Sequence, residues 1–389
     1  DVKGPIEIMY RAERALFELR QGRPIWIKDQ VHSQATFSSI VAPVETLTDT
    51  YLSALTNLSN TNLKLIITAS RAKALKILTN EAPGLLPDAI SLSLDSTYDL
   101  NQLLHLSSGL RQEDSMPNEP AYRLETEALS LIRLLRLIPA AISCRITPEY
   151  YKAAESFAKT FDILSTTAEE ISELTDTANS SIARISEANV PLRNVSGAKF
   201  ILFRENNTLF EHLAVLVGEP LQTGDPVPIR LHSACLTGDL FDSLKCDCGE
   251  QLHKSLDYFT QNNGGVFLYL NQEGRGIGLG NKLRAYQLQD ELGLDTIDAD
   301  CALGFRSDER DYGVGMKMLN NLGVSRINIL TNNPDKVGWA EKAGLEVVNR
   351  VPLFGKPNPH NLPYVKAKIE RAGHFLEAML EEGQKANSR

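Results

Sequence analysis

The first half of the chain alternates between helical spacing of apolar residues and short apolar runs. Apolar positions recur every three to four residues over 6–19, which predicts an amphipathic helix that ends at Gly22-Arg23-Pro24. Strands are predicted at 25–27, 63–68, 140–146 and 162–165, and further helices at 70–78 with Ser70 as the cap, at 126–137 and at 150–161. This alternation predicts an α/β or α+β domain built in layers.

A polar stretch rich in Ser, Thr and Glu separates this half from the next. It covers residues 169–194, so we predict a boundary near residue 190 that divides the chain into domains 1–189 and 190–389. Beyond the boundary, strands are predicted at 198–204, 211–217, 265–270 and 327–330, with a turn at 205–207 and a final helix after His374. We expect this second domain to be α+β, with its functional site at strand ends and loops.

Composition narrows the class of protein. The 389 residues are 42% hydrophobic and 23% charged, which is typical of a globular chain. The net charge of −9 disfavours a nucleic-acid coat protein, although a few local cations suffice to bind one triphosphate. The sequence has neither a membrane-length apolar run nor the layout of a secretory signal. We therefore expect a cytoplasmic protein with no membrane or nucleic-acid partner.

Three of the five cysteines lie close together in the sequence. Cys235, Cys246 and Cys248 have the spacing C-x10-C-x-C, which is atypical of a disulfide framework and typical of a metal site. Three thiolates would leave one tetrahedral position open for catalysis, whereas a fourth ligand from His232 or His253 would close a structural site. The spacing alone favours neither, and small buried cysteines remain the third hypothesis.

Two polar segments after predicted strands suit a phosphate site, and each also has a purely structural interpretation. The Gly-rich stretch 272–279 precedes Lys282 and Arg284, but taken alone it favours a tight strand-to-helix turn. Thr331 and Lys336 suit a phosphate contact, or else a helix cap with an exposed lysine. The charged stretch 307–313 is typical of a solvated turn.

Taken together and in order, these segments resemble GTP cyclohydrolase II over residues 190–376. The matching stretches are Arg230-Leu231-His232-Ser233, Cys235-Leu236-Thr237-Gly238-Asp239, Cys246-Asp247-Cys248-Gly249, Glu273-Gly274-Arg275, Asn281-Lys282-Leu283-Arg284-Ala285-Tyr286, Asp308-Glu309-Arg310-Asp311, Thr331-Asn332-Asn333-Pro334 and Asn358-Pro359-His360-Asn361. The resemblance implies a hydrolase that opens the imidazole ring of GTP. Formate and pyrophosphate would be released and a diaminopyrimidinone ribosyl phosphate formed, at the first step of riboflavin biosynthesis. It also implies a homodimer.

The resemblance further implies a role for each matching residue. The three cysteines would hold one zinc ion in an open, catalytic site that activates water for attack at C8 of guanine, and Tyr286 would hydrogen-bond near the reacting ring. Asp308 and Arg310 would serve the loss of pyrophosphate, with Mg²⁺ on the phosphates. Arg310 would act either as a nucleophile or as an electrostatic clamp oriented by Asp308. Contacts with GTP would come from Arg230, Gln251, Glu273, Gly274, Arg275, Thr296, Thr331 and Lys336.

The match has three departures. Ala234 stands where the family commonly has Glu, and Asp300 where Asn is usual. One extra residue lies between Tyr286 and Thr296, so the assignment of Thr296 depends on where that insertion is placed. Two further hypotheses stay open beside the enzyme. One is a cyclohydrolase variant with an altered substrate, and the other is a purine-nucleotide sensor that does not catalyse.

The first half is similar, in patches at 7–27, 126–141 and 157–159, to 3,4-dihydroxy-2-butanone-4-phosphate synthase. That enzyme needs an acidic loop after its first strand and a metal-binding His before a Thr-Glu-Ala run. Here residues 28–40 contain only Asp29, and Glu125 replaces the His. We therefore predict a synthase-like fold without synthase activity, serving dimerisation, stability or regulation. The competing hypothesis is that Glu45 or Glu127 restores the reaction.

Overall fold

The computed structural model forms two compact units. The first contains residues 1–179 and 280–309, and the second contains residues 180–279 and 310–389. The described residues are 5–29, 37–59, 63–78, 87–95, 97–109, 116–176, 181–193, 195, 197–206, 208, 210–222, 224–356, 358–361, 369 and 371. The helix predicted after His374 lies outside them. Among the described residues, no helix is long and apolar enough to cross a bilayer.

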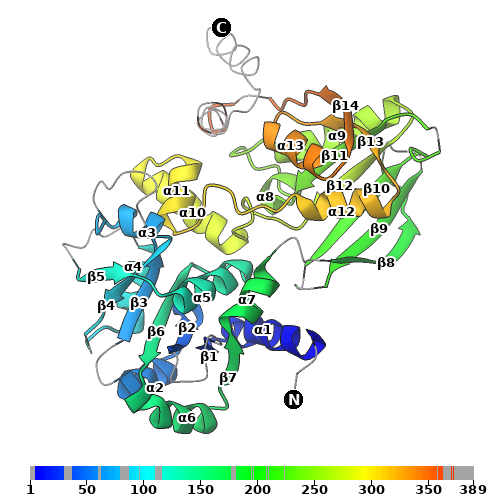
Figure 1. The fold of residues 1–389 in the computed structure, drawn as a ribbon. Coiled ribbons are helices and arrows are strands. Elements are labelled where there is room, and N and C mark those ends of the chain that lie inside the picture. Colours follow the sequence, from blue (N-terminus) through cyan, green and yellow to red (C-terminus); the bar gives the residue numbers. More distant parts are fainter. Residues whose placement is uncertain are drawn as a thin grey trace. The chain divides into compact units, whose positions relative to one another are not determined.

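The first unit is a mixed sheet with helices on both faces (Figure 1). Its strands run in the order β5-β4-β3-β6-β2-β1-β7, and they are antiparallel neighbours except for the parallel pair β1 and β7. The strands are β1 (Ile25–Lys28), β2 (Ser38–Pro43), β3 (Leu63–Thr68), β4 (Ala89–Ser93), β5 (Asn118–Pro120), β6 (Ala140–Ile146) and β7 (Leu164–Thr167). This layered α/β arrangement confirms the predicted fold class.

Alternating side chains along these strands build one core on each face of the sheet. In β3, Leu65 and Ile67 point into one core while Ile66 points into the other, as the two-residue period of a strand requires. The first face carries η1 (Val44–Thr46), α2 (Asp49–Ser59), α3 (Ala69–Ala74), α4 (Leu100–Ser108) and α6 (Tyr151–Thr160), which follows η2 (Pro148–Tyr150). The second face carries α1 (Pro5–Arg20), α5 (Arg123–Leu134) and α7 (Ala168–Thr175).

Two helices from the middle of the chain belong to this first unit. They are α10 (Leu279–Leu292), from Gly280 onward, and α11 (Thr296–Ala302), which packs against α3. The chain therefore passes from one compact unit to the other three times, whereas the sequence suggested one boundary near residue 190. The segment that returns to the first unit carries three predicted site residues, which are Tyr286, Thr296 and Asp308.

The second unit is a sheet that is parallel on one side and antiparallel on the other. Its order is β14-β13-β11-β12-β10-β9-β8, where β11 to β14 form parallel pairs and the remaining neighbours are antiparallel. The strands are β8 (Ile182–Asn189), β9 (Ala198–Glu205), β10 (Glu211–Val217), β11 (Val227–Ser233), β12 (Gly265–Leu270), β13 (Arg326–Leu330) and β14 (Glu346–Val351). The predicted hairpin of two strands is the pair β9 and β10.

Helices cover both faces of this second sheet. The side chains of α12 (Gly313–Asn321) and α13 (Pro334–Lys342) pack on one face, and those of α9 (Cys248–Gln261) pack on the other. A short helix, α8 (Leu236–Asp239), follows β11. The helix α9 approaches the sheet closely because residue 265 is glycine. A Cβ there would lie 2.1 Å from the ring of the buried Phe259.

The structure corrects three predicted elements and adds two within the polar stretch 169–194. In that stretch, α7 buries Ile171 and Leu174, and β8 pairs with β9. The strand expected at 162–165 begins two residues later, at Leu164. The helix expected at 70–78 is capped by Thr68 instead of Ser70 and ends at Ala74. The helix expected at 126–137 begins at Arg123 and ends at Leu134.

The contact at Gly265 gives a stability prediction with a matched control. We expect Gly265→Ala to lower the free energy of unfolding by about 1–3 kcal/mol, because the added methyl group overpacks the α9 interface. Gly338 lies within α13 and a Cβ there meets nothing within 4 Å, so Gly338→Ala should raise stability by up to about 1 kcal/mol. Urea unfolding followed by circular dichroism would measure both. Equal effects of the two substitutions would contradict the packing argument.

Candidate functional site

The candidate site lies in the second unit, where three neighbouring parallel strands end. The strands β13, β11 and β12 lie side by side, so the residues after each one meet at the same edge of the sheet. The cysteine loop follows β11, the Gly-rich loop follows β12, and Thr331 follows β13. Crevices at the carboxyl ends of parallel strands are where such sheets bind ligands.

The three predicted metal-binding cysteines come together. The sulfur atoms of Cys235 and Cys246 lie 3.6 Å apart, and the sulfurs of all three cysteines lie within 4.8 Å of one another. Thiolates on one tetrahedral zinc ion, with Zn–S bonds of about 2.3 Å, lie about 3.8 Å apart. The donor type and the spacing therefore fit one zinc ion. The hydrogen bond with Cys235, together with burial, raises the pKa of Cys246 to about 11.

This convergence depends on a close backbone approach at Gly238. A Cβ on Gly238 would lie 2.7 Å from the sulfur of Cys246 and 3.1 Å from that of Cys235. A Cβ on Gly249, at the start of α9, would lie 2.4 Å from the carbonyl oxygen of Gly238. Only glycine at both positions lets α8 and α9 pack closely enough to place the three sulfurs around one point.

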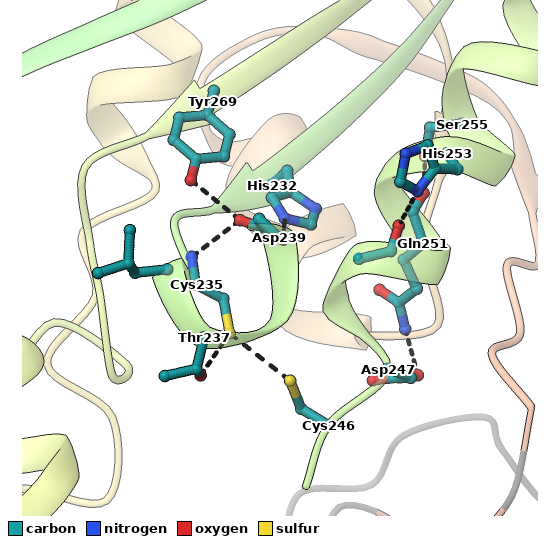
Figure 2. A network of polar contacts seen from close by, with 12 residues as sticks. His232, Cys235, Thr237, Asp239, Cys246, Asp247, Gln251, His253, Ser255 and Tyr269 are labelled. Atoms are coloured by element: carbon teal, nitrogen blue, oxygen red, sulfur yellow. Dashed lines mark hydrogen bonds and ion pairs between the residues drawn. The ribbon is translucent and has the colours of Figure 1, made fainter. Parts of the chain in front are cut away.

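Asp239 is the centre of a hydrogen-bond network that orients the cysteine loop (Figure 2). Its Oδ2 accepts hydrogen bonds from the backbone N–H of Cys235 and from the hydroxyl of Tyr269, both at 2.9 Å. Its Oδ1 lies 3.0 Å from Nε2 of His232. Because these donors come from β11, β12 and the loop itself, the carboxylate fixes Cys235 relative to two strands of the sheet.

His232 is a member of this network through its contact with Asp239. It is buried, which lowers its pKa, so it is neutral near pH 7. Its ring stacks on Tyr269 at 5.7 Å between centroids. His253, the other candidate, lies with Nδ1 2.8 Å from the carbonyl of Gly249. Within the described residues, the group able to hold a metal ion consists of the three cysteines.

Glu273 ties the Gly-rich loop to the cysteine loop. Its Oε2 accepts a hydrogen bond of 2.6 Å from the N–H of Leu236, and Oε1 accepts one of 3.1 Å from the N–H of Gly274. The chain then turns through positive φ angles, 62° at Gly274 and 57° at Arg275. The tight turn that the sequence favours here is therefore present. Arg275 adopts the left-handed conformation without being glycine, a strain often found at functional sites.

A small cationic pocket lies beside the cysteine cluster. Its volume is about 80 Å³, and Cys248 belongs both to its wall and to the cluster. The lining contains four positively charged side chains against the single carboxylate of Asp247. The predicted site residues that line it are Arg230, Cys248, Gln251, Arg275, Arg310, Thr331 and Lys336. This charge pattern suits an anion such as a phosphate chain.

Hydrogen bonds hold the walls of this pocket in place. Arg230 is buried, donates to the carbonyl of Leu330 at 2.8 Å, and also donates to Gln251, whose amide donates to Asp247 at 2.6 Å. Burial lowers the pKa of Arg230, although a guanidinium stays charged at pH 7. Its Nε atom is buried and has no hydrogen-bond partner in the described part of the chain.

The segment after β13 is both a helix start and a wall of the pocket. Asn333 caps α13 by accepting a hydrogen bond from the N–H of Asp335. Lys336 is buried and donates to the carbonyl of Leu231 at 2.7 Å, so the alternative of an exposed lysine is wrong. Thr331 accepts a hydrogen bond from the N–H of Asn333 at 3.0 Å.

Three predicted site residues belong to the first unit instead. Tyr286 lies on α10 with the Lys282 ammonium 5.8 Å from its ring centroid, Thr296 begins α11, and Asp308 follows α11. Conversely, the structure gives organising roles to Asp239 and Asp247, for which the sequence suggested none. Both lie inside the motifs that contain the cysteines, and that position was the only signal.

Comparison with known proteins places these features in a family. The model of the GTP cyclohydrolase II family matches residues 183–352. The RibBA riboflavin biosynthesis protein of Parabacteroides distasonis is 41% identical over 254 residues, which cover 64% of this chain and 62% of that protein. A solved structure titled as RibBX, a two domain 3,4-dihydroxy-2-butanone 4-phosphate synthase from A. baumannii, covers 88% of this chain and 99% of its own at 14% identity, with a TM-score of 0.34.

A further relative extends the match beyond the cysteine-containing half. The GTP cyclohydrolase-2 of Azospirillum brasilense is 38% identical over 377 residues, which cover 95% of this chain and 94% of that protein. Because a relative of this identity aligns with nearly the whole of both chains, this chain belongs to the GTP cyclohydrolase II family.

Proposed function

We propose that this chain is a zinc-dependent GTP cyclohydrolase II, which hydrolyses the imidazole ring of GTP and releases formate and pyrophosphate. The observation that carries the proposal is the position of Cys248. It belongs to a three-thiol group within reach of one metal ion and also lines a pocket with four cations. A hydrolytic centre and a site for phosphates would therefore share a wall.

The cysteines Cys235, Cys246 and Cys248 would hold the zinc ion, which would supply Lewis acidity for attack by water on the guanine ring. Arg230, Arg275 and Lys336 would neutralise the triphosphate, to which Mg²⁺ would also bind. Gln251 and Thr331 would add polar contacts from the pocket wall. Glu273 and Gly274 would contact GTP from the loop that also caps the cysteine turn. The roles of Tyr286, Thr296 and Asp308 rest on the family resemblance.

We infer that Arg310 acts as an electrostatic clamp and not as a nucleophile. Its guanidinium lies 5.3 Å from the ring centroid of Tyr312, whose face stabilises a cation. An arginine guanidinium does not give up the proton that nucleophilic attack requires. A clamp that stabilises charge on the phosphate fits these surroundings, and Asp308 would orient it.

In the first unit, the position of the missing synthase His supports the proposal that synthase activity is absent. Glu125 is fully buried, and its Oε1 and Oε2 each accept a hydrogen bond of 2.8 Å from Arg145. A guanidinium therefore lies where the resemblance would place a divalent cation, and like charges repel. Glu45 cannot supply a free carboxylate instead, because its two oxygens bind Arg284 and the N–H of Ile138.

A two-substrate assay tests these proposals. We expect the zinc-loaded protein to release formate from GTP and Mg²⁺ and to release nothing from ribulose 5-phosphate. Cys248→Ser should abolish formate release, because it removes one of the three proposed zinc ligands. Arg310→Ala should slow pyrophosphate release by about 100-fold or more, because it removes a charge from the proposed transition state.

The outcomes separate the hypotheses. If the wild type bound zinc and GTP but released no formate, the nucleotide sensor would replace the enzyme. If ribulose 5-phosphate were turned over, the argument from Glu125 and Arg145 would be wrong. If another purine nucleotide were opened faster than GTP, the variant with an altered substrate would be correct.

The network around Asp239 gives a prediction about zinc affinity. We expect Asp239→Asn to weaken zinc binding by about 10- to 100-fold, because the loop that carries Cys235 loses a charged acceptor shared by three donors. Competition with a chromophoric chelator would measure the affinity. Asp257→Asn is the matched control, since Asp257 is an exposed residue of the same unit on α9. Unchanged affinity in Asp239→Asn would show that the network does not organise the site.

A further inference from the structure

The segment 280–309 carries Tyr286, Thr296 and Asp308, yet it packs within the first unit. Near its start, the amide of Asn281 donates to the carbonyl of Arg136 at 2.8 Å, and Arg284 forms an ion pair of 2.8 Å with Glu45. At its end, Oε1 of Glu309 lies 3.7 Å from Nε of Arg133. The segment is therefore attached to the first unit near both ends.

A further attachment lies between these two ends, where Arg71 contacts the last residue of α11. This arginine follows β3 on α3 and is only 2% exposed. Its Nη1 donates a hydrogen bond of 2.7 Å to the carbonyl of Ala302, the last residue of α11. Its other nitrogens donate to carbonyls at the end of α4: Nε to Leu106 at 2.9 Å, and Nη2 to Gly109 at 2.7 Å and to His105 at 3.3 Å.

One guanidinium thus caps the carboxyl ends of two helices at once. The last carbonyls of a helix lack partners within the helix and carry partial negative charge, so a cation there is favourable. In the described part of the chain, the partners of this guanidinium are backbone carbonyls and not carboxylates. Burial lowers its pKa to about 10, so it remains a cation at pH 7. The planar group can reach both helices together, which the single ammonium of a lysine cannot do equally well.

The backbone just after α11 packs on the same place. A Cβ at Gly304 would lie 3.0 Å from the hydroxyl of Thr68 and 3.5 Å from Cβ of Arg71, and the φ angle of Gly304 is 92°. Residue 304 must therefore be glycine, because its φ angle is positive and because its neighbours leave no room for a Cβ. The end of α11 is held from two sides, by the guanidinium and by this close backbone contact.

We propose that Arg71 is a positioning residue for the cyclohydrolase reaction. It holds α11 and the turn after it against α4, and so fixes the segment that carries Thr296 at the start of α11 and Asp308 six residues beyond Ala302. This inference rests on the proposed function, which assigns those residues to GTP. It gives the first unit a task in catalysis that needs no synthase chemistry.

The experiment compares the buried Arg71 with Arg145, a largely buried arginine of the same unit. Arg71→Gln removes the cation that joins α11 to α4. Arg145→Gln removes a cation whose hydrogen bonds, among the described residues, go to Glu125, Glu119 and Ser91 and not to 280–309. Steady-state formate release, zinc content and hydrogen exchange of peptides covering 296–305 would be measured for both, and unfolding midpoints would show how far each variant is destabilised.

We expect Arg71→Gln to lower kcat/KM for GTP by about 10- to 100-fold, since small displacements of reacting groups have effects of this size. Its zinc content should stay that of the wild type, and exchange in 296–305 should rise. Arg71→Lys should recover part of the activity. Arg145→Gln should keep kcat/KM within about twofold of the wild type, even if its unfolding midpoint falls as far as that of Arg71→Gln.

Gly304→Ala keeps the proposal open to refutation if Arg71→Gln does not fold. It displaces the same turn without removing a buried charge, and it should lower kcat/KM in the same direction. An active wild type together with unchanged kcat/KM in both the Arg71 and the Gly304 variants would overturn the proposal. An equal loss of activity in Arg145→Gln would also overturn it, because stability alone would then explain the effect. A wild type that releases no formate would instead refute the proposed function.

Discussion

In this protein the three cysteine sulfurs converge because the backbone that carries them packs closely on itself. The close approach lies at Gly238 and Gly249, where a Cβ would collide with a sulfur or with a carbonyl. The rest of the site is arranged around this close packing. Asp239 ties the loop to the sheet, and Glu273 joins it to the loop after the next strand.

The parallel half of the second sheet explains why these loops meet. Adjacent parallel strands deliver their following residues to one edge, so residues separated by about a hundred positions, such as Arg230 and Leu330, become hydrogen-bonded neighbours. The pocket contains four cations for the same reason, although the chain as a whole carries a net charge of −9. Local charge, and not total charge, determines which ligand such a pocket can accept.

The sequence predicted well what depends on short-range pattern. The strands around Ile66, Leu268 and Ile329 were found because buried strands appear as apolar runs, and the cysteines were found because metal ligands cluster. The sequence failed at β8, an edge strand whose side chains are mostly exposed and show no alternation. It also missed the capping role of Thr68 and the packing of 280–309 with the first unit, because both depend on contacts between distant parts of the chain.

The ion pair of Glu125 and Arg145 couples two positions of the first unit. Replacing Glu125 alone would remove the fully buried carboxylate from the largely buried Arg145 guanidinium and leave it with the partly exposed Glu119, which destabilises the unit. Replacing Arg145 alone would instead leave the buried Glu125 carboxylate without its cation. Each single substitution passes through a destabilised protein, so the two positions depend on one another. A change at either position is therefore tolerated best when the other position changes with it.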